Sequence, residues 1–296
     1  MWTLWSGGSG LGRKATHHLA FASVVALACV AVVAQGAIAA APLSVVPPPV
    51  PPPPPEATAP PPRRAATGMR RTWDVPVLMY HRITCAPPDA RLPGLWVCPG
   101  VFERTMRLLS ERGWVTITGA QLADARAAGR PLPRRSFVIV FDDGDRDGYD
   151  HAYPILERYG FQAVFAVVVD RVGVNRSAMT WSELLELQAA GHEIANHSMS
   201  HANVARLGES GLEREVGKSA ELLRTHLGAW PRTFVYPFGS WDGDALDAVR
   251  RAHHDIAFTT EWGATRRSSD RFAAPRVRVS QGDSPERIVG RLSIFD

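Results

Sequence analysis

Short apolar segments alternate with amphipathic ones from residue 75 to residue 279, and this alternation restricts the fold more than any other feature of the chain. The apolar segments are rich in β-branched residues, which favours buried strands, and the intervening segments have helical spacing. We expect strands at residues 75–80, 114–117, 137–141, 162–169, 192–196, 233–236, 256–259 and 276–279. About seven such β-α repeats predict an α/β barrel, whose functional groups gather at the carboxyl ends of its strands.

The expected strand from Phe137 to Phe141 ends in two adjacent carboxylates, Asp142 and Asp143, followed by Gly144. Strand alternation breaks where a strand opens into a glycine turn, so both acids can line one cavity. One acid could then bind a metal ion while the other accepts a proton. Taken alone, the same residues also fit a simple polar turn.

A second group of metal-ligating residue types follows about fifty residues later. His197 and His201 are four residues apart, which puts both rings on one face if the chain is helical there. His192 opens an expected strand, and we expect it to pack or hydrogen-bond locally. One aspartate and two histidines leave a coordination position for water, as in a catalytic zinc site.

Three motifs occur in a fixed order, and together they carry a family resemblance. They are Phe141-Asp-Asp-Gly144, His197-Ser-x-x-His201 and Tyr236-Pro-Phe-Gly239. From about residue 74 onwards the chain resembles the NodB-type polysaccharide deacetylases, carbohydrate esterase family 4. Residues 77–83, 149–156 and 179–181 are similar to the branch that deacetylates poly-N-acetylglucosamine. The resemblance implies a distorted (β/α) barrel, which agrees with the expected repeats.

The resemblance also implies roles for the clustered residues. Asp143, His197 and His201 would hold one divalent metal ion, and Asp142 would be the general base. Zinc is the expected ion, and cobalt or nickel also suit this ligand set. The substrate would be an acetylated polysaccharide.

Two features of the broad family are absent from this chain. Its third motif commonly has an arginine where Val235 stands, so the partner of Asp142 is unknown, and the late histidine that serves as general acid is missing. His81, at the end of the first strand, is therefore a candidate for protonating the leaving amine, with a structural hydrogen bond as the alternative. A backbone N–H near Phe238 would stabilise an oxyanion, and Pro237 and Gly239 would shape this turn so that the backbone can approach the substrate.

Other aromatic residues and histidines lie near the expected site loops. Trp181 is a candidate sugar platform, because flat aromatic rings suit the apolar faces of sugars, although core packing is the alternative. We expect His253 and His254 at a surface helix end.

The N-terminal segment, residues 1–41, is expected to direct export. Arg13 and Lys14 precede an apolar run of about 23 residues, which fits either a cleaved signal peptide or an uncleaved anchor in the membrane. Both interpretations place the rest of the chain outside the cytoplasm, in the periplasm or at the extracellular face of the cytoplasmic membrane.

Residues 42–72 form an expected linker, and residues 73–296 form the expected deacetylase domain. Twelve of the residues from 42 to 62 are proline, which predicts a semi-rigid spacer. Six basic residues and only Glu56 among the acids precede residue 73, so the domain carries about one net negative charge despite a total of +4. This charge gives little support to nucleic-acid binding.

Three functions from different classes remain open. The first is a metal-dependent N-deacetylase of a polymer that contains N-acetylglucosamine, either an exopolysaccharide or peptidoglycan. The second keeps the site but hydrolyses an O-acetyl ester. The third is a catalytically silent, membrane-tethered carbohydrate-binding protein. Cys85 and Cys98 could form a disulfide or remain free thiols, and both states stay open at this point.

Overall fold

The computed structural model describes residues 68–69, 74–266 and 270–296. The expected export segment, residues 1–41, and nearly all of the expected linker, residues 42–72, lie outside the described residues. Among the helices that the structure describes, none combines the length and the apolar character needed to cross a bilayer.

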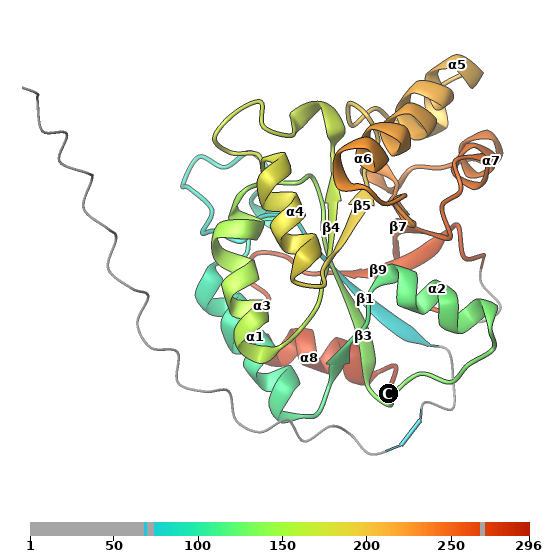
Figure 1. The fold of residues 1–296 in the computed structure, drawn as a ribbon. Coiled ribbons are helices and arrows are strands. Elements are labelled where there is room, and N and C mark those ends of the chain that lie inside the picture. The colour runs from blue at the N-terminus through green and yellow to red at the C-terminus, as the bar shows by residue number, and fades with distance from the viewer. Residues whose placement is uncertain (1–67, 70–73, 267–269) are drawn as a thin grey trace, which may run out of the picture. The chain divides into compact units, whose positions relative to one another are not determined.

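Seven parallel strands close into a barrel at the centre of the molecule (Figure 1). The strands are β1 (Val75–Tyr80), β2 (Val115–Thr116), β3 (Ser136–Phe141), β4 (Val164–Val167), β5 (Glu193–Asn196), β6 (Thr233–Val235), β7 (Ile256–Trp262), β8 (Ala264–Thr265) and β9 (Ala274–Arg278). The parallel order β1-β3-β4-β5-β6-β7-β9 returns to β1. Strand β2 pairs only with the start of β3, and β8 runs antiparallel to the start of β1. The expected (β/α) barrel is therefore confirmed.

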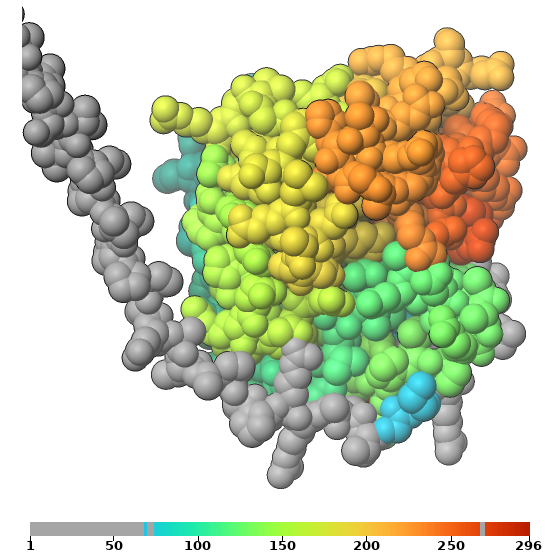
Figure 2. Space-filling view, in the orientation of Figure 1, coloured from blue at the N-terminus to red at the C-terminus, as the bar shows by residue number. Residues whose placement is uncertain are grey.

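Helices surround this barrel (Figure 1). They are α1 (Pro99–Glu111), α2 (Gly119–Ala127), α3 (Tyr153–Tyr159), α4 (Trp181–Ala189), α5 (Glu209–Leu212), α6 (Ser219–Leu227), α7 (Gly243–Arg251) and α8 (Pro285–Ser293). A π-helical segment, η5 (Glu213–Lys218), joins α5 to α6 without a break. The space-filling view shows α4, in yellow, beside α6, in orange, on the outer surface (Figure 2). Helix α8 was not among the expected elements.

Alternate residues of each strand point into the barrel, because side chains on an extended chain alternate between its two faces. The interior is filled with aliphatic side chains and one aromatic ring. They include Val77, Val138, Val164, Ala195, Val235 and Phe258, and all six are fully buried. This packed interior forms a solid floor beneath the carboxyl ends of the strands.

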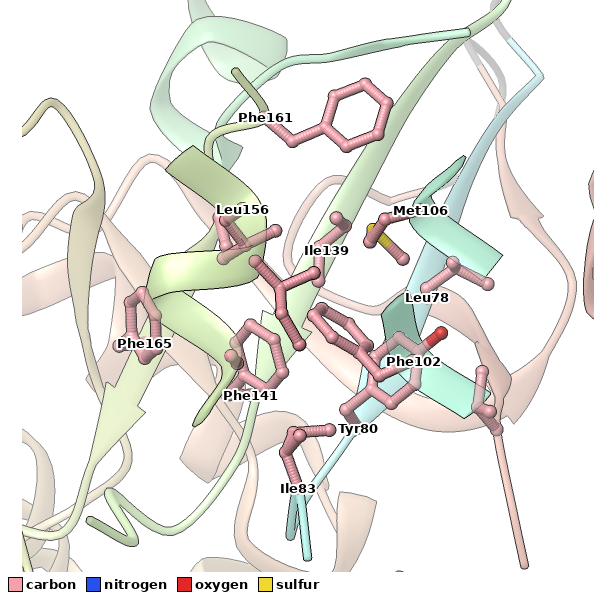
Figure 3. Packing of buried hydrophobic residues seen from close by; sticks show 14 of the residues in the cluster. Leu78, Tyr80, Ile83, Phe102, Met106, Ile139, Phe141, Leu156, Phe161 and Phe165 are labelled. Carbon is pink, nitrogen blue, oxygen red and sulfur yellow. The ribbon is translucent and has the colours of Figure 1, made fainter. Parts of the chain in front are cut away.

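The opposite faces of β1 and β3 pack outward against helices α1 and α3. Figure 3 shows Tyr80 and Phe141 meeting Phe102 of α1 in an aromatic cluster. The Phe141 ring also stacks on Phe165 of β4, with 5.0 Å between the ring centroids. Ring pairs of this kind add about 0.5–1.5 kcal/mol each to the burial of the rings. The cluster therefore fixes the last residue of β3, directly before Asp142.

Candidate metal and catalytic site

A cavity of about 650 Å³ opens where several barrel strands end. Six predicted site residues line it, namely His81, Asp142, Asp143, His197, His201 and Phe238. They follow β1, β3, β5 and β6, which lie far apart in the sequence. The barrel thus brings together side chains that the sequence could associate only through motifs.

Asp143, His197 and His201 form a compact group of three potential metal ligands. The Nε2 atoms of His197 and His201 lie 3.5 and 3.3 Å from Oδ1 of Asp143. Two ligands of a tetrahedral zinc ion, each at ~2.0–2.1 Å, are themselves separated by about 3.4 Å. His197 Nδ1 lies 2.7 Å from the Val235 carbonyl oxygen, to which it donates, so Nε2 is left as the coordinating atom. The donor set and its spacing fit one divalent ion.

The turn after β3 aims both adjacent carboxylates into the same cavity. Asp143 and Gly144 have positive φ angles of 73° and 71°, which ends strand alternation as the sequence predicted. A Cβ atom on Gly144 would lie 3.1 Å from the Val167 side chain, so the turn passes tightly over β4. Glycine adopts this left-handed conformation without steric cost.

The two histidines meet through a loop, so the helical arrangement considered for them is wrong. Residues 197–203 contain no helix, and Ser198 and His201 have positive φ angles of 69° and 64°. The backbone N–H of His201 donates to Ser198 Oγ at 2.9 Å. Asn196 Oδ1 in turn accepts a hydrogen bond from the Ser198 N–H at 3.0 Å. These side chains take the place of helical backbone hydrogen bonds.

A buried carboxylate from η5 anchors the same loop. Glu215 is only 2% exposed, and it accepts hydrogen bonds from the backbone N–H and the hydroxyl of Ser200, both at 2.8 Å. Its backbone oxygen accepts from the N–H of Met199. Glu215 therefore holds the residues between the two histidine ligands, although no motif in the sequence marked it.

Arg276 of β9 is the partner of Asp142 that the sequence did not reveal. Its Nη1 and Nη2 donate to the two carboxylate oxygens of Asp142 at 2.7 and 2.9 Å, and its Nε donates to the Thr259 carbonyl oxygen at 2.6 Å. Arg276 is 1% exposed and Asp142 is 3% exposed. A bidentate pair of this kind fixes both the charge and the orientation of the carboxylate.

The surrounding charges keep both cavity carboxylates ionised. Burial alone would raise the pKa of Asp142, but the charge and hydrogen bonds of Arg276 outweigh burial and hold that pKa below its ordinary value. Burial also acts to raise the pKa of Asp143, and the hydrogen bond and charge of His197 lower it well below the usual range. Asp142 is thus an ionised group, able to accept a proton.

His81 lies beside Asp142, with 3.7 Å between its Nε2 and Asp142 Oδ2. Burial lowers the pKa of His81, and the neighbouring carboxylates only partly offset this. The next residue, Arg82, donates through Nε to Asp147 at 2.9 Å, which ties the turn after β1 to the turn after β3. His81 is therefore in reach of both Asp142 and the cavity.

The Tyr236-Pro-Phe-Gly239 turn forms another part of the cavity. Phe238 has a positive φ of 61°, is 63% exposed, and sits with its ring centroid 4.6 Å from that of His201. A Cβ atom on Gly239 would lie 2.1 Å from Thr260 Oγ1, so this position requires glycine. Pro237 begins the turn and is buried.

A disulfide closes the loop that forms another wall. Cys85 and Cys98 are bonded, with 4.2 Å between their Cα atoms, which answers the question that the sequence left open. Leu92 and Leu95 of this loop line the cavity.

Two residues that the sequence singled out lie elsewhere. Trp181 is the first residue of α4, and its ring stacks on His226 of α6 with centroids 3.9 Å apart. It does not line the cavity. His192 is buried, and its Nδ1 accepts from the Ala163 N–H at 3.1 Å, as expected for a locally bonded residue.

Comparison with known proteins relates part of this chain to a protein family. Residues 129–257 match the family model for polysaccharide deacetylase. This segment of the chain therefore resembles the polysaccharide deacetylases. The matched segment contains Asp142, Asp143, His197 and His201, whereas His81 and Arg276 lie outside it.

Named relatives and a solved structure are also similar to this chain. A poly-β-1,6-N-acetyl-D-glucosamine N-deacetylase of Staphylococcus aureus is 28% identical over 66% of this chain and 71% of its own length. One of Escherichia coli is 26% identical over 70% of this chain but only 37% of its own length. The fold is similar to that of Streptococcus pyogenes deacetylase PplD, with a TM-score of 0.70 and 22% identity over 74% of this chain and 97% of that one.

Proposed function

We propose that this protein is a polysaccharide deacetylase, which hydrolyses the N-acetyl groups of a polymer that contains N-acetylglucosamine in a metal-dependent reaction. One observation carries the proposal. The same cavity is lined by the Asp143–His197–His201 group and by an ionised Asp142 that is hydrogen-bonded to Arg276. The names of the relatives support an exopolysaccharide such as poly-N-acetylglucosamine, and peptidoglycan contains the same acetylated sugar.

The proposed metal ligands are Asp143, His197 and His201, with zinc as the expected ion and cobalt or nickel as alternatives. A divalent ion held by these residues would polarise the acetyl carbonyl and would lower the pKa of a water molecule towards ~7. The ionised state of Asp143 and the hydrogen bond from His197 to Val235 suit both side chains for this binding.

The other residues supply proton transfer and orientation. Asp142 accepts the proton that the attacking water loses, while Arg276 keeps the carboxylate pointed at it. His81 delivers to the departing amine the proton that Asp142 has taken from the attacking water. The 3.7 Å between His81 Nε2 and Asp142 Oδ2 fits transfer of that proton through one water molecule. The backbone N–H of Phe238 stabilises the oxyanion.

The proposed setting is outside the cytoplasm. The basic flank and apolar run before residue 42 support export, either as a cleaved signal peptide or as a membrane anchor. The disulfide between Cys85 and Cys98 also suits an oxidising compartment.

The experiment follows acetate release from β-1,6-linked N-acetylglucosamine oligomers by zinc-loaded protein. Chelator-treated protein and an Asp142→Asn variant serve as controls. We expect release that needs metal and is lost in the variant. Release from O-acetylated xylan alone would assign ester hydrolysis instead. No release by a metal-loaded protein from these oligomers, from peptidoglycan fragments or from the xylan would contradict the proposal.

A further inference from the structure

Arg278, the last residue of β9, stands at the mouth of the catalytic cavity. It pairs in register with Met79 of β1, and it lies two residues after Arg276, so both arginines belong to the barrel-facing side of β9. Arg276 is buried below, whereas the Arg278 side chain is exposed and lines the cavity. Strand β9 thus carries one arginine that pairs with Asp142 and a second arginine whose side chain faces the open cavity.

The backbone beneath Arg278 is held firmly. Arg291 of α8 donates through Nη1 to the Arg278 carbonyl oxygen at 3.0 Å, and the same guanidinium grips Asp283. The N–H of Val279 donates to the Met79 carbonyl oxygen at 3.0 Å. The Arg278 side chain therefore projects from a fixed point.

The charge of Arg278 is the one that the cavity leaves uncompensated. Of the other charged side chains lining it, Asp142 pairs with Arg276, Asp143 contacts two histidines, and Arg171 donates to Asp145 at 2.8 Å. Within the described part of the chain, the Arg278 guanidinium has neither an ion pair nor a side-chain hydrogen bond. Its charge does reach the site, because it contributes to lowering the pKa of His81.

We propose that Arg278 binds an anionic group, a carboxylate or a phosphate, on a sugar next to the acetylated one. The guanidinium fork matches either group with two parallel hydrogen bonds. An acidic glycan would thus supply the negative charge that compensates the Arg278 guanidinium at the mouth of the cavity. This inference rests on the proposed function and narrows its substrate class to polymers that carry anionic groups.

The test compares oligosaccharides that differ only in charge. One is a tetramer of alternating N-acetylglucosamine and its lactyl ether, which carries carboxylates, and its partner has those carboxylates reduced to alcohols. A phosphorylated tetramer distinguishes phosphate from carboxylate. Binding is measured by calorimetry, and acetate release is followed in parallel, at low salt and in 0.5 M NaCl.

Three variants accompany the native protein. Arg278→Gln removes the charge, Arg278→Lys keeps it, and Arg251→Gln makes the same charge change at an exposed position of α7 outside the cavity. We expect the native protein to bind an anionic tetramer about fivefold more tightly than the reduced one, a preference typical of an exposed ion pair that salt screens. The preference should vanish in Arg278→Gln and persist in the other two variants.

Equal binding of charged and reduced tetramers by the native protein would overturn the inference. A preference that survives Arg278→Gln would do the same. Charge-selective binding through Arg278 without acetate release from any tetramer would instead leave this inference standing and contradict the proposed hydrolysis.

Discussion

The pairing of Asp142 with Arg276 links the chemistry of the site to the interior of the barrel. Arg276 rises from the apolar barrel interior, where an uncompensated charge would be costly. Its three side-chain hydrogen bonds go to the Asp142 carboxylate and to Thr259. The pair therefore matters both for stability and for the orientation of the proposed base.

Replacing Arg276 should damage turnover more than metal binding. In Arg276→Gln, Asp142 loses its bidentate partner, and we expect kcat to fall about 10- to 100-fold, as for other groups that orient site residues. Breaking a buried pair should also lower the free energy of unfolding by about 3–5 kcal/mol. Metal content, kcat and urea unfolding of the variant test this, with Arg287→Gln on the surface of α8 as the control. An unchanged kcat would show that Arg276 does not orient the base.

His254 illustrates a residue whose environment differs from expectation. It is 3% exposed, so the predicted surface position is wrong, whereas the adjacent His253 is exposed as predicted. Its Nδ1 donates to the Pro231 carbonyl oxygen at 2.8 Å, and its Nε2 accepts from Asn196. Both ring nitrogens are thus satisfied in the neutral form.

Burial of His254 should make folding stability depend on pH. Burial lowers the pKa of His254 to about 4, whereas the unfolded chain has its ordinary value near 6.5. Between these pH values His254 is protonated in the unfolded state and neutral in the folded state. The free energy of unfolding therefore falls by up to about 3 kcal/mol as the pH is lowered from 6.5 to 4.

Urea unfolding between pH 4.5 and 7.5 tests this dependence. In His254→Gln, the slope of the free energy of unfolding against pH should be smaller in this window, by an amount that corresponds to up to one proton. His253→Gln removes an exposed histidine and should leave the slope unchanged. Equal slopes in the native protein and in His254→Gln would show that His254 does not contribute to the pH dependence of stability.

At the scale of elements, the loop after β5 depends on the helical rod of α5, η5 and α6. Glu215 lies in the π-helical segment of this rod and holds Ser200, the residue directly before His201. The loop itself has no regular structure, and two of its residues adopt left-handed backbone conformations. The position of His201 is therefore set by a neighbouring element.

Glu215→Ala should weaken metal binding about 10- to 100-fold, because it frees the loop that carries His201. Glu213→Ala is a matched control, since Glu213 is an exposed carboxylate in the same segment. Metal dissociation constants measured by competition with a chelator distinguish the two variants. Native affinity in Glu215→Ala would mean that the loop holds its shape without this anchor.

Most elements with local signals were predictable from the sequence, although α8 was missed despite its N-cap Ser284 and its helical spacing of apolar residues. Contacts between distant residues were not predictable. The alternation of strands and helices predicted the barrel, and the motifs predicted that Asp142, Asp143, His197 and His201 would share one cavity.

At the scale of the whole molecule, barrel closure accounts for the site residue that was missed. Arg276 is 134 residues from Asp142 in sequence, and the pairing of β9 with β7 and β1 brings it beneath the cavity. Arg276 at the start of the expected strand 276–279 was the available signal, but the register of that strand was not predictable. Trp181 shows the converse, because an aromatic residue at a loop–helix junction packs against a neighbouring helix instead of facing the cavity.

The most direct test of the central claim compares metal content with turnover in two variants. Asp142→Asn leaves the three proposed ligands intact, whereas His201→Ala removes one of them. We predict that purified, zinc-reconstituted Asp142→Asn retains one ion per chain yet releases no acetate, and that His201→Ala loses both the ion and activity. Equal metal loss in the two variants, or turnover by Asp142→Asn, would contradict the division of roles between the adjacent carboxylates.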